Sequence, residues 1–268
     1  MNKMAKMTIG SAVFTLVFSY MTGYAGAADE QSKHAYSATF HAAKSKTSNP
    51  AAKKSAAQQK KEALAIFHAE GKKPGDLFVL YDGSDGTLSF NYLSLKSSKL
   101  DDYAQQSAKY KAPVLQQPEA LPEGYEYHSS EITPPFPQFL SEPYQKMLKE
   151  LKAEAKGKMY YAKKLKWSEA GESQLIFFKD SDIIRISAKK LQPIAIESTR
   201  VAGKGETIEK LSVKGIDAMY ITGSDVLYST MLQWEDAEKK LQYQISLYKN
   251  SPLTKEDLIA IAESIMQG

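Results

Sequence analysis

The sequence comprises 268 residues with a formal net charge of +4 and an apolar content of 43%, which is ordinary for a globular protein. This length predicts one large or two modest domains with enough chain to bury a core. The absence of cysteine excludes disulfides, thiolate metal sites, cysteine nucleophiles and a lipid-modified cysteine. Lysine supplies nearly all of the positive charge, with Arg185 and Arg200 as the two arginines. Sequence-specific nucleic-acid binding is therefore not expected, because forked recognition of phosphate favours arginine.

The first 27 residues have the organisation of a secretory signal peptide. Lys3 and Lys6 form a basic start, an uncharged stretch runs from residue 7 to residue 28, and small residues occupy positions 25–27. We expect cleavage after Ala27 and export to a secreted or extracytoplasmic envelope location. The alternative is an uncleaved N-terminal membrane anchor, because the uncharged stretch is just long enough to span a bilayer.

A lysine-rich segment follows the predicted signal peptide. Residues 28–54 are predicted to form a flexible basic arm, since the stretch 31–61 holds seven lysines and no acid and offers little apolar surface. One interpretation of this arm is electrostatic contact with an anionic wall polymer or with a membrane or wall surface. The other interpretation is a solvated linker.

Residues 55–112 predict a helix followed by a β-hairpin. Apolar residues at helical spacing precede a stop signal at Gly71. The segments 76–81 and 87–95 are then predicted as strands, joined by the turn-rich stretch DGSDG. A calcium loop at this turn is disfavoured, because the residues that follow offer no carboxylate at the last ligand position. The polar and proline-punctuated segment 98–122 is interpreted as a junction.

Residues 113–268 predict an antiparallel sheet packed by helices. A helix is expected within 137–157, after Pro143, and short strand-like runs separated by turn signals follow it. Brief connections favour an antiparallel sheet over βαβ units, so the predicted fold class is α+β, with a curved antiparallel β-sheet and a C-terminal helix closing one face. The predicted strands are 159–167, 174–179, 182–187, 193–201, 207–213, 216–222, 226–234 and 241–248.

The closing helix has a complete set of local signals. Thr254 is the predicted N-cap and Asp257 stands three residues later, which is a close variant of the capping box. Leu253 before the cap is spaced to contact Leu258. An apolar stripe at helical spacing predicts a packing element without reactive groups. The stripe consists of Leu258, Ile261, Ala262 and Ile265.

The C-terminal part of the chain resembles a known family. LPEGYEY at 121–127 opens a segment that continues through Gly-Ile at 215–216, LQW at 232–234 and YQI at 243–245, and ends in the closing helix. This pattern is similar to the bacterial envelope family catalogued as domain of unknown function 4367, and the resemblance covers roughly residues 113–268.

The resemblance implies an extracytoplasmic domain of a kind common in spore-forming Gram-positive bacteria, exported alone or attached to anti-sigma-type membrane proteins. It also implies a sheet-and-helix fold related in style to lipoprotein-carrier and envelope-stress-sensor domains, with no catalytic residues. The sequence departs from the better-known architecture, since it has no cytoplasmic zinc-binding His/Cys segment and no internal transmembrane helix after residue 28. An anti-sigma role inside the cell is therefore not expected, whereas sensing outside the membrane is compatible with the sequence.

No motif identifies a catalytic, cofactor-binding or metal-binding residue, so none is predicted. His34, His41, His68 and His128 lack the spacing of metal ligands. The sequence also lacks the G-x-S-x-G elbow of serine hydrolases. A secreted hydrolase is the alternative that stays open, because the fold could bring two distant carboxylates together.

Aromatic residues recur along the predicted strands, and they have two interpretations. They form core and cross-strand pairs, or they line a hydrophobic groove beneath the closing helix that admits an acyl chain, a glycan or a partner strand. The candidate groove residues are Phe177, Tyr220, Tyr228, Trp234, Tyr243, Leu258, Ile261 and Ile265. The sequence thus predicts a non-catalytic exported module that binds or senses an envelope protein, a lipid or an anionic wall polymer. The alternatives are the hydrolase and a wall-bound interaction protein.

Overall fold

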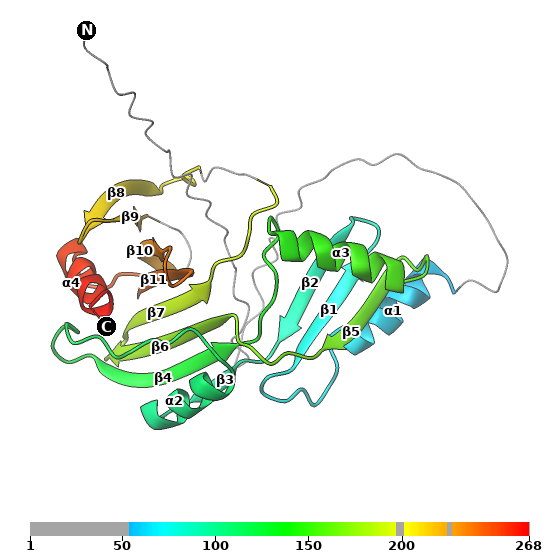
Figure 1. The fold of residues 1–268 in the computed structure, drawn as a ribbon, viewed down its shortest axis with the longest axis horizontal. Helices are drawn as coiled ribbons and strands as arrows, with labels where there is room; N and C mark the ends of the chain where they lie inside the picture. Colours follow the sequence, from blue (N-terminus) through cyan, green and yellow to red (C-terminus); the bar gives the residue numbers. More distant parts are fainter. Residues whose placement is uncertain (1–53, 197–200, 224–226, 268) are drawn as a thin grey trace, which may run out of the picture.

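Two antiparallel sheets and four helices make up the part of the protein that the computed structural model describes, residues 54–196, 201–223 and 227–267. This arrangement confirms the predicted α+β fold class (Figure 1). The predicted signal peptide and residues 28–53 of the predicted arm lie outside these ranges. Within the ranges, each helix is too short or too polar to cross a bilayer.

The smaller sheet is a three-stranded layer covered by a helix on each face. Its strands lie in the order β2 (Thr87–Tyr92), β1 (Leu77–Asp82) and β5 (Tyr160–Leu165). Helix α1 (Ala56–Phe67) covers one face and helix α3 (Glu142–Glu154) covers the other (Figure 1). The predicted N-terminal helix and β-hairpin are therefore present, and β5 completes their sheet from a distant part of the chain.

The central strand β1 is buried on both sides because its side chains alternate between the two helices. Val79 and Tyr81 pack against α3, whereas Phe78 and Leu80 pack against α1. The sequence of such a strand is a continuous run of apolar residues and does not alternate between apolar and polar residues. The hairpin turn that follows β1 is closed by Asp82, whose carboxylate accepts the backbone N–H of Ser84 at 2.9 Å.

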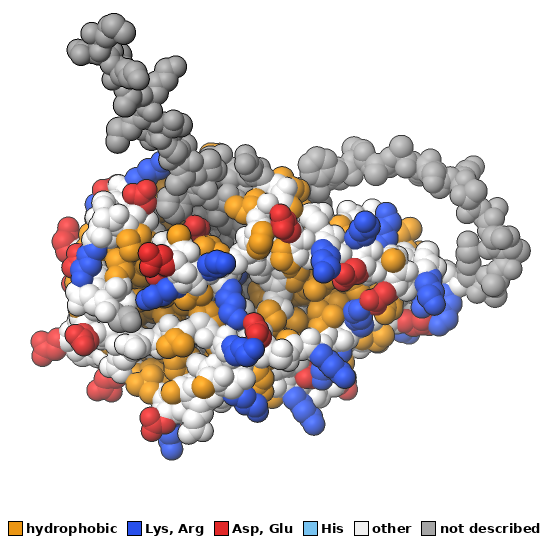
Figure 2. Space-filling view, viewed as in Figure 1, with side chains coloured by type: hydrophobic (Ala, Val, Ile, Leu, Met, Phe, Trp, Pro, Cys, Tyr) orange, Lys and Arg blue, Asp and Glu red, His pale blue; other side chains and the backbone are white. Residues whose placement is uncertain are grey.

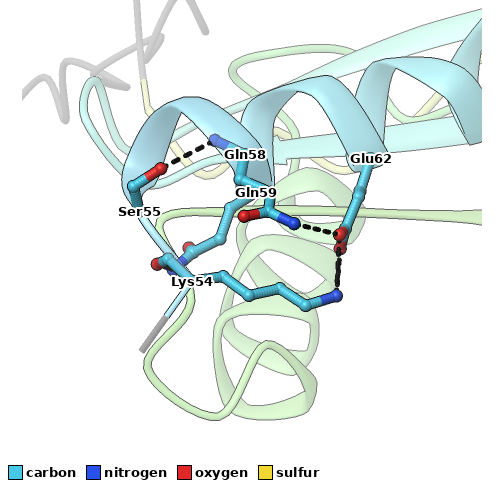
Figure 3. A network of polar contacts seen from close by, with 5 residues as sticks. All are labelled: Lys54, Ser55, Gln58, Gln59 and Glu62. Carbon is cyan, nitrogen blue, oxygen red and sulfur yellow. Dashed lines mark hydrogen bonds and ion pairs between the residues drawn. The ribbon is translucent and has the colours of Figure 1, made fainter. Parts of the chain in front are cut away.

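The first turn of α1 is held by a network of polar contacts (Figure 3). Ser55 caps the helix by accepting a backbone N–H of the first turn at 3.2 Å. Lys54 pairs with Glu62 at 2.7 Å, and this contact lowers the pKa of Glu62. The side chain of Gln59 accepts the backbone N–H of Met159 at 2.8 Å, which fastens α1 to the start of β5.

The larger sheet has eight antiparallel strands in the order β3-β4-β6-β7-β11-β10-β9-β8, and it curves from β8 to β3 across Figure 1. Two helices, α2 and α4, pack against it. The elements are β3 (Leu95–Ser97), α2 (Leu100–Lys109), β4 (Glu126–Thr133), β6 (Glu172–Lys179), β7 (Asp182–Lys190), β8 (Thr207–Val213), β9 (Ile216–Thr222), β10 (Tyr228–Asp236), β11 (Leu241–Tyr248) and α4 (Lys255–Ile265).

The main core lies between the larger sheet and these two helices. Leu175, Ile186, Ile245 and Leu232 stand opposite one another across β6, β7, β11 and β10, and each is completely buried. Helix α4 adds three further residues of zero exposure to the same cluster. These are Leu258, Ile261 and Ala262, so the predicted apolar stripe of the closing helix is confirmed.

The start of α4 is fixed by the predicted capping box. The Thr254 hydroxyl accepts the Asp257 N–H at 3.2 Å, and the Asp257 carboxylate accepts the Thr254 N–H at 2.8 Å. The segment that leads into the helix is tied to β7, because Asp182 accepts hydrogen bonds from the hydroxyls of Ser251, at 2.6 Å, and Tyr125. Burial raises the pKa of Tyr125, so this hydroxyl keeps its proton as the donor.

Two local predictions were wrong. The segment interpreted as a polar junction contains helix α2, whose buried side is provided by Tyr103 and Ser107. The predicted strand 193–201 is a loop at residues 193–196, with a single bridge from Ile194 to Ser141; residues 197–200 lie outside the description. The backbone of this loop bonds to the segment before α3, so its alternating apolar side chains do not enter a sheet.

The chain passes back and forth between the two sheets. It leaves the smaller sheet after β2 to form β3, α2 and β4 of the larger one, returns through α3 to β5, and then completes the larger sheet. Residue 113, where a domain boundary was expected, lies between helix α2 and strand β4. Both elements contribute to the core of the larger sheet.

Removal of the Leu258 side chain tests how much the closing helix stabilises the fold. We expect Leu258→Ala to lower the free energy of unfolding by about 3 kcal/mol, because the side chain is completely buried. The matched control is Leu227→Ala, at a side chain that is 53% exposed, for which we expect about 0.5 kcal/mol or less. Urea unfolding followed by circular dichroism measures both, and equal effects would contradict the assignment of α4 to the core.

The contact between Asp76 and Lys164 makes stability depend on pH. Lys164 donates to Asp76 at 2.5 Å and lowers the pKa of that carboxyl below its usual 3.8. A lowered pKa in the folded state contributes stability above the usual pKa, and this contribution disappears as the pH falls through the lowered value.

We expect Asp76→Asn to cost about 1 kcal/mol at pH 7, a modest value because the lysine is largely exposed. The gap between the two proteins should close when urea unfolding is repeated below pH 3. A gap that stays constant would show that the carboxylate charge is not the cause, and Asp85→Asn in the exposed turn serves as the control.

Candidate functional site

Seven of the eight predicted groove residues belong to one packed core beneath α4. Phe177, Trp234, Leu258 and Ile261 are at most 1% exposed, and the rings of Trp234 and Tyr243 stack with centroids 5.3 Å apart. Two residues of this group, Tyr220 and Ile265, are only partly buried and pack at the rim of the core. Side chains therefore fill the space under the middle of the helix.

Tyr228 is separated from the other predicted groove residues. Its ring lies 4.1 Å from the guanidinium group of Arg185. Arg185 alternates along β7 with Ile184 and Ile186, which point into the main core. Because successive side chains of a strand point to opposite faces, Tyr228 contacts the sheet on the face away from α4.

A depression of about 750 Å³ opens at the edge of α4, where three segments meet. One wall is formed by residues 112–119, which we call the strap. The floor includes Leu241 and Tyr243 of β11, and the opposite wall includes Ile265 and Gln267 at the end of α4. Tyr243 and Ile265 were both predicted as groove residues, so the predicted groove and the observed depression share one edge. The volume lies within the range of ligand pockets.

The strap runs between α2 and β4 and forms neither a helix nor a strand. Pro113, Leu115 and Pro118 are buried, whereas Val114 between them is 65% exposed. The Leu115 N–H donates to the Tyr103 hydroxyl at 3.1 Å. This is the single hydrogen bond that residues 113–119 form with the described part of the chain. The remaining N–H and C=O groups of the strap have no hydrogen-bond partner among the residues that the structure describes.

Comparison with known proteins identifies a family for the C-terminal region. Residues 155–265 match the family model described as "Domain of unknown function (DUF4367)". The match confirms the resemblance and begins at residue 155 rather than at 113, so it includes α4 and β11 but not the strap. No curated protein and no solved structure matches the chain.

A buried cluster of charged and amide groups lies on the sheet face away from α4. Glu172 of β6 stands directly opposite Lys189 of β7, and the Gln174 side chain donates to Glu172 at 3.0 Å. Burial raises the pKa of Glu172 and lowers that of Lys189, because each charged form loses its water. Ionisable groups whose pKa is shifted in this way occur both at functional sites and in structural ion-pair networks.

The surroundings of this cluster identify it as a joint between the two sheets. Phe136, in the segment before α3, stacks on Tyr92 of the smaller sheet with ring centroids 5.1 Å apart. The Lys189 ammonium of the larger sheet lies 5.6 Å from the centre of the same ring. Phe136 thus packs between an aromatic ring of one sheet and a buried cation of the other, and it fixes their relative position.

The groups that could support hydrolysis or metal binding do not form an open site. Glu131 and Glu172 project from the same face of β4 and β6, but Lys96 pairs with Glu131 at 2.8 Å and Gln174 bonds Glu172. Of the histidines, His128 stacks on a phenylalanine of β6. Within the ranges that the structure describes, no three histidine, aspartate or glutamate side chains converge as metal ligands would.

The strap was the part of the site that sequence reasoning missed. The prolines at 113 and 118 indicated a junction, and they do prevent a regular strand. The sequence carries no signal for it, because Val114 and Leu115 are both apolar although the first is exposed and the second is buried. The depression itself has no sequence motif, since its walls come from segments more than a hundred residues apart.

The bond between Tyr103 and the strap can be tested by hydrogen exchange. We expect Tyr103→Phe to abolish the protection of the Leu115 amide and to lower the free energy of unfolding by about 1 kcal/mol, because a buried N–H loses its acceptor. Tyr160→Phe, at a tyrosine of strand β5 in the smaller sheet, is the control. Unchanged protection of the Leu115 amide in Tyr103→Phe would show that another acceptor holds the strap.

Proposed function

We propose that the protein is an exported, non-catalytic binding module of the cell envelope, and that it holds an extended polypeptide segment of an envelope partner in the depression between the strap and α4. Export is supported by the signal-like first 27 residues. An envelope role is supported by what the resemblance of residues 113–268 implies about location.

The observation that carries this proposal is the free backbone of the strap beside a depression of ligand size. An extended peptide can add to an exposed extended segment through main-chain hydrogen bonds. The N–H groups of Val114, Gln116 and Gln117 lack partners in the described part of the chain, so they are available as donors. Pairing of this kind recognises the main chain of the peptide. It therefore supplies affinity that depends little on the sequence of the peptide.

The side chains around the depression suit alternate residues of such a peptide. Leu241, Tyr243 and Ile265 present apolar surface, which would accept an inward apolar side chain. Gln116 and Gln267 line the same space with amides, which would satisfy polar groups at its rim. A bound peptide would therefore be anchored by one or two apolar residues and oriented by its main chain.

The test is selection of extended peptides from a random library on the whole chain, followed by affinity measurements with the enriched sequence. We expect Val114→Glu to weaken binding at least tenfold, because it places a charge against the apolar side of the peptide. Val201→Glu is the matched control, since Val201 is 83% exposed and lies outside the depression. Both positions are exposed, so neither change should affect the fold.

Hydrogen exchange with the bound peptide provides the second readout. The amides of Val114, Gln116 and Gln117 should gain protection if the peptide pairs with the strap. Absence of any enriched sequence, or equal weakening by both glutamate variants, would contradict the proposal. Tight binding without protection of the strap amides would also contradict it, since the ligand would then lie elsewhere.

A further inference from the structure

Helix α3 carries a row of exposed lysines on its outer face. Lys146, Lys149 and Lys152 follow one another at intervals of three residues, and Lys156 follows just beyond the helix, so they lie along one side. The opposite side of the helix is buried through Tyr144 and Leu151. All four lysines are exposed, and none forms an ion pair with the described part of the chain.

Other lysines of the smaller sheet are neutralised, which distinguishes the row on α3. Lys163 pairs with Glu154 at 2.7 Å, and Lys164 pairs with Asp76 at 2.5 Å. The four lysines of the row outnumber the two exposed glutamates of the same helix that form no ion pair with the described part of the chain, Glu142 and Glu150, so this surface carries an excess of positive charge. A surface of this kind attracts a partner of negative charge.

Exposed apolar side chains lie at the N-terminal end of the same helix. Phe139, Ile194 and Ile196 are 55%, 44% and 49% exposed. They are held close together, because the N–H of Ala195 donates to the carbonyl oxygen of Leu140 at 2.8 Å. Figure 2 shows hydrophobic side chains around this end of α3, and lysines with some acidic side chains among them along the helix.

We propose that this surface, the α3 lysine row together with Phe139, Ile194 and Ile196, docks the protein on an anionic phospholipid membrane. Lysines near a membrane are attracted to anionic headgroups, and adjacent apolar side chains enter the boundary between headgroups and acyl chains. Both components are needed for lasting contact, and the surface offers both. A soluble phosphate polymer would use the lysines but would leave the apolar side chains exposed to water.

The proposal concerns a face different from the depression beside α4, and it does not depend on the peptide ligand proposed there. It also differs from membrane contact through residues 28–54, which was one of two interpretations of that segment. The experiment must therefore report contact at α3 itself. The absence of cysteine makes this feasible, since one introduced cysteine can be labelled specifically.

The experiment uses the full chain with Phe139→Cys carrying an environment-sensitive fluorophore, mixed with vesicles of phosphatidylglycerol and phosphatidylcholine. The control label is Lys210→Cys on β8, on the other side of the molecule from α3 (Figure 1). We expect a blue shift and protection from an aqueous quencher at position 139 alone. Vesicles of pure phosphatidylcholine should give neither change.

Replacement of the lysines tests the charge component. Combined Lys146→Gln, Lys149→Gln, Lys152→Gln and Lys156→Gln should weaken the response at position 139 at least tenfold, since each lysine near an anionic surface contributes roughly fivefold in affinity. The matched control replaces four exposed lysines away from α3. These are Lys204, Lys210, Lys239 and Lys249.

Each other outcome would overturn the proposal. Equal loss in the two quadruple variants would mean that net charge alone drives binding. Vesicle binding without a change at position 139 would place the contact at another segment. Binding of soluble polyphosphate that suppresses the response while vesicles alone give none would identify a polymer site instead. Unfolding by urea of each variant confirms that the fold is retained.

Discussion

The apolar face of the eight-stranded sheet must be kept from water, and the rest of the structure depends on how this is done. Leu175, Ile186, Ile245 and Leu232 form one uninterrupted apolar row across four strands, with zero exposure. Each such side chain contributes about 1.5–3 kcal/mol through burial. Helices α2 and α4 pack against the core that contains this row, and the position of α4 is set locally by its capping box and by the hydrogen bonds that Asp182 receives.

This packing decides where a ligand can lie. Because side chains of α4 fill the space over the middle of the sheet, the open volume is displaced to the edge of the helix, where the strap passes. The joint at Phe136 links the larger sheet to the smaller one and fixes how the smaller sheet is presented. The molecule thus has a depression beside the larger sheet and a lysine-bearing helix, α3, on the smaller sheet.

The sequence predicted the parts of this arrangement that depend on neighbouring residues. The closing helix was predicted in full because Thr254, Asp257 and the residues of its apolar stripe each lie within four residues of the next. Helix α2 was missed because its buried side consists of Tyr103 and a serine, and because Lys99 at its start provides no side-chain cap.

The pairing of β5 with β1 could not be predicted, since register between distant strands is set by packing. The loop at Ile194 followed the alternation of a strand but has no strand partner. Of the residues predicted to line a groove, Tyr243 and Ile265 line the observed depression, because alternation gives the face of a residue but not the empty space beside it.

The measurement that tests the central claim most directly is native mass spectrometry of the protein collected after secretion by its own host. The account predicts a chain of residues 28–268 that carries a peptide of defined mass, and loss of this peptide in Val114→Glu but not in Val201→Glu. A bare chain in every sample, or an adduct that organic solvent removes as a lipid, would contradict a peptide site beside α4.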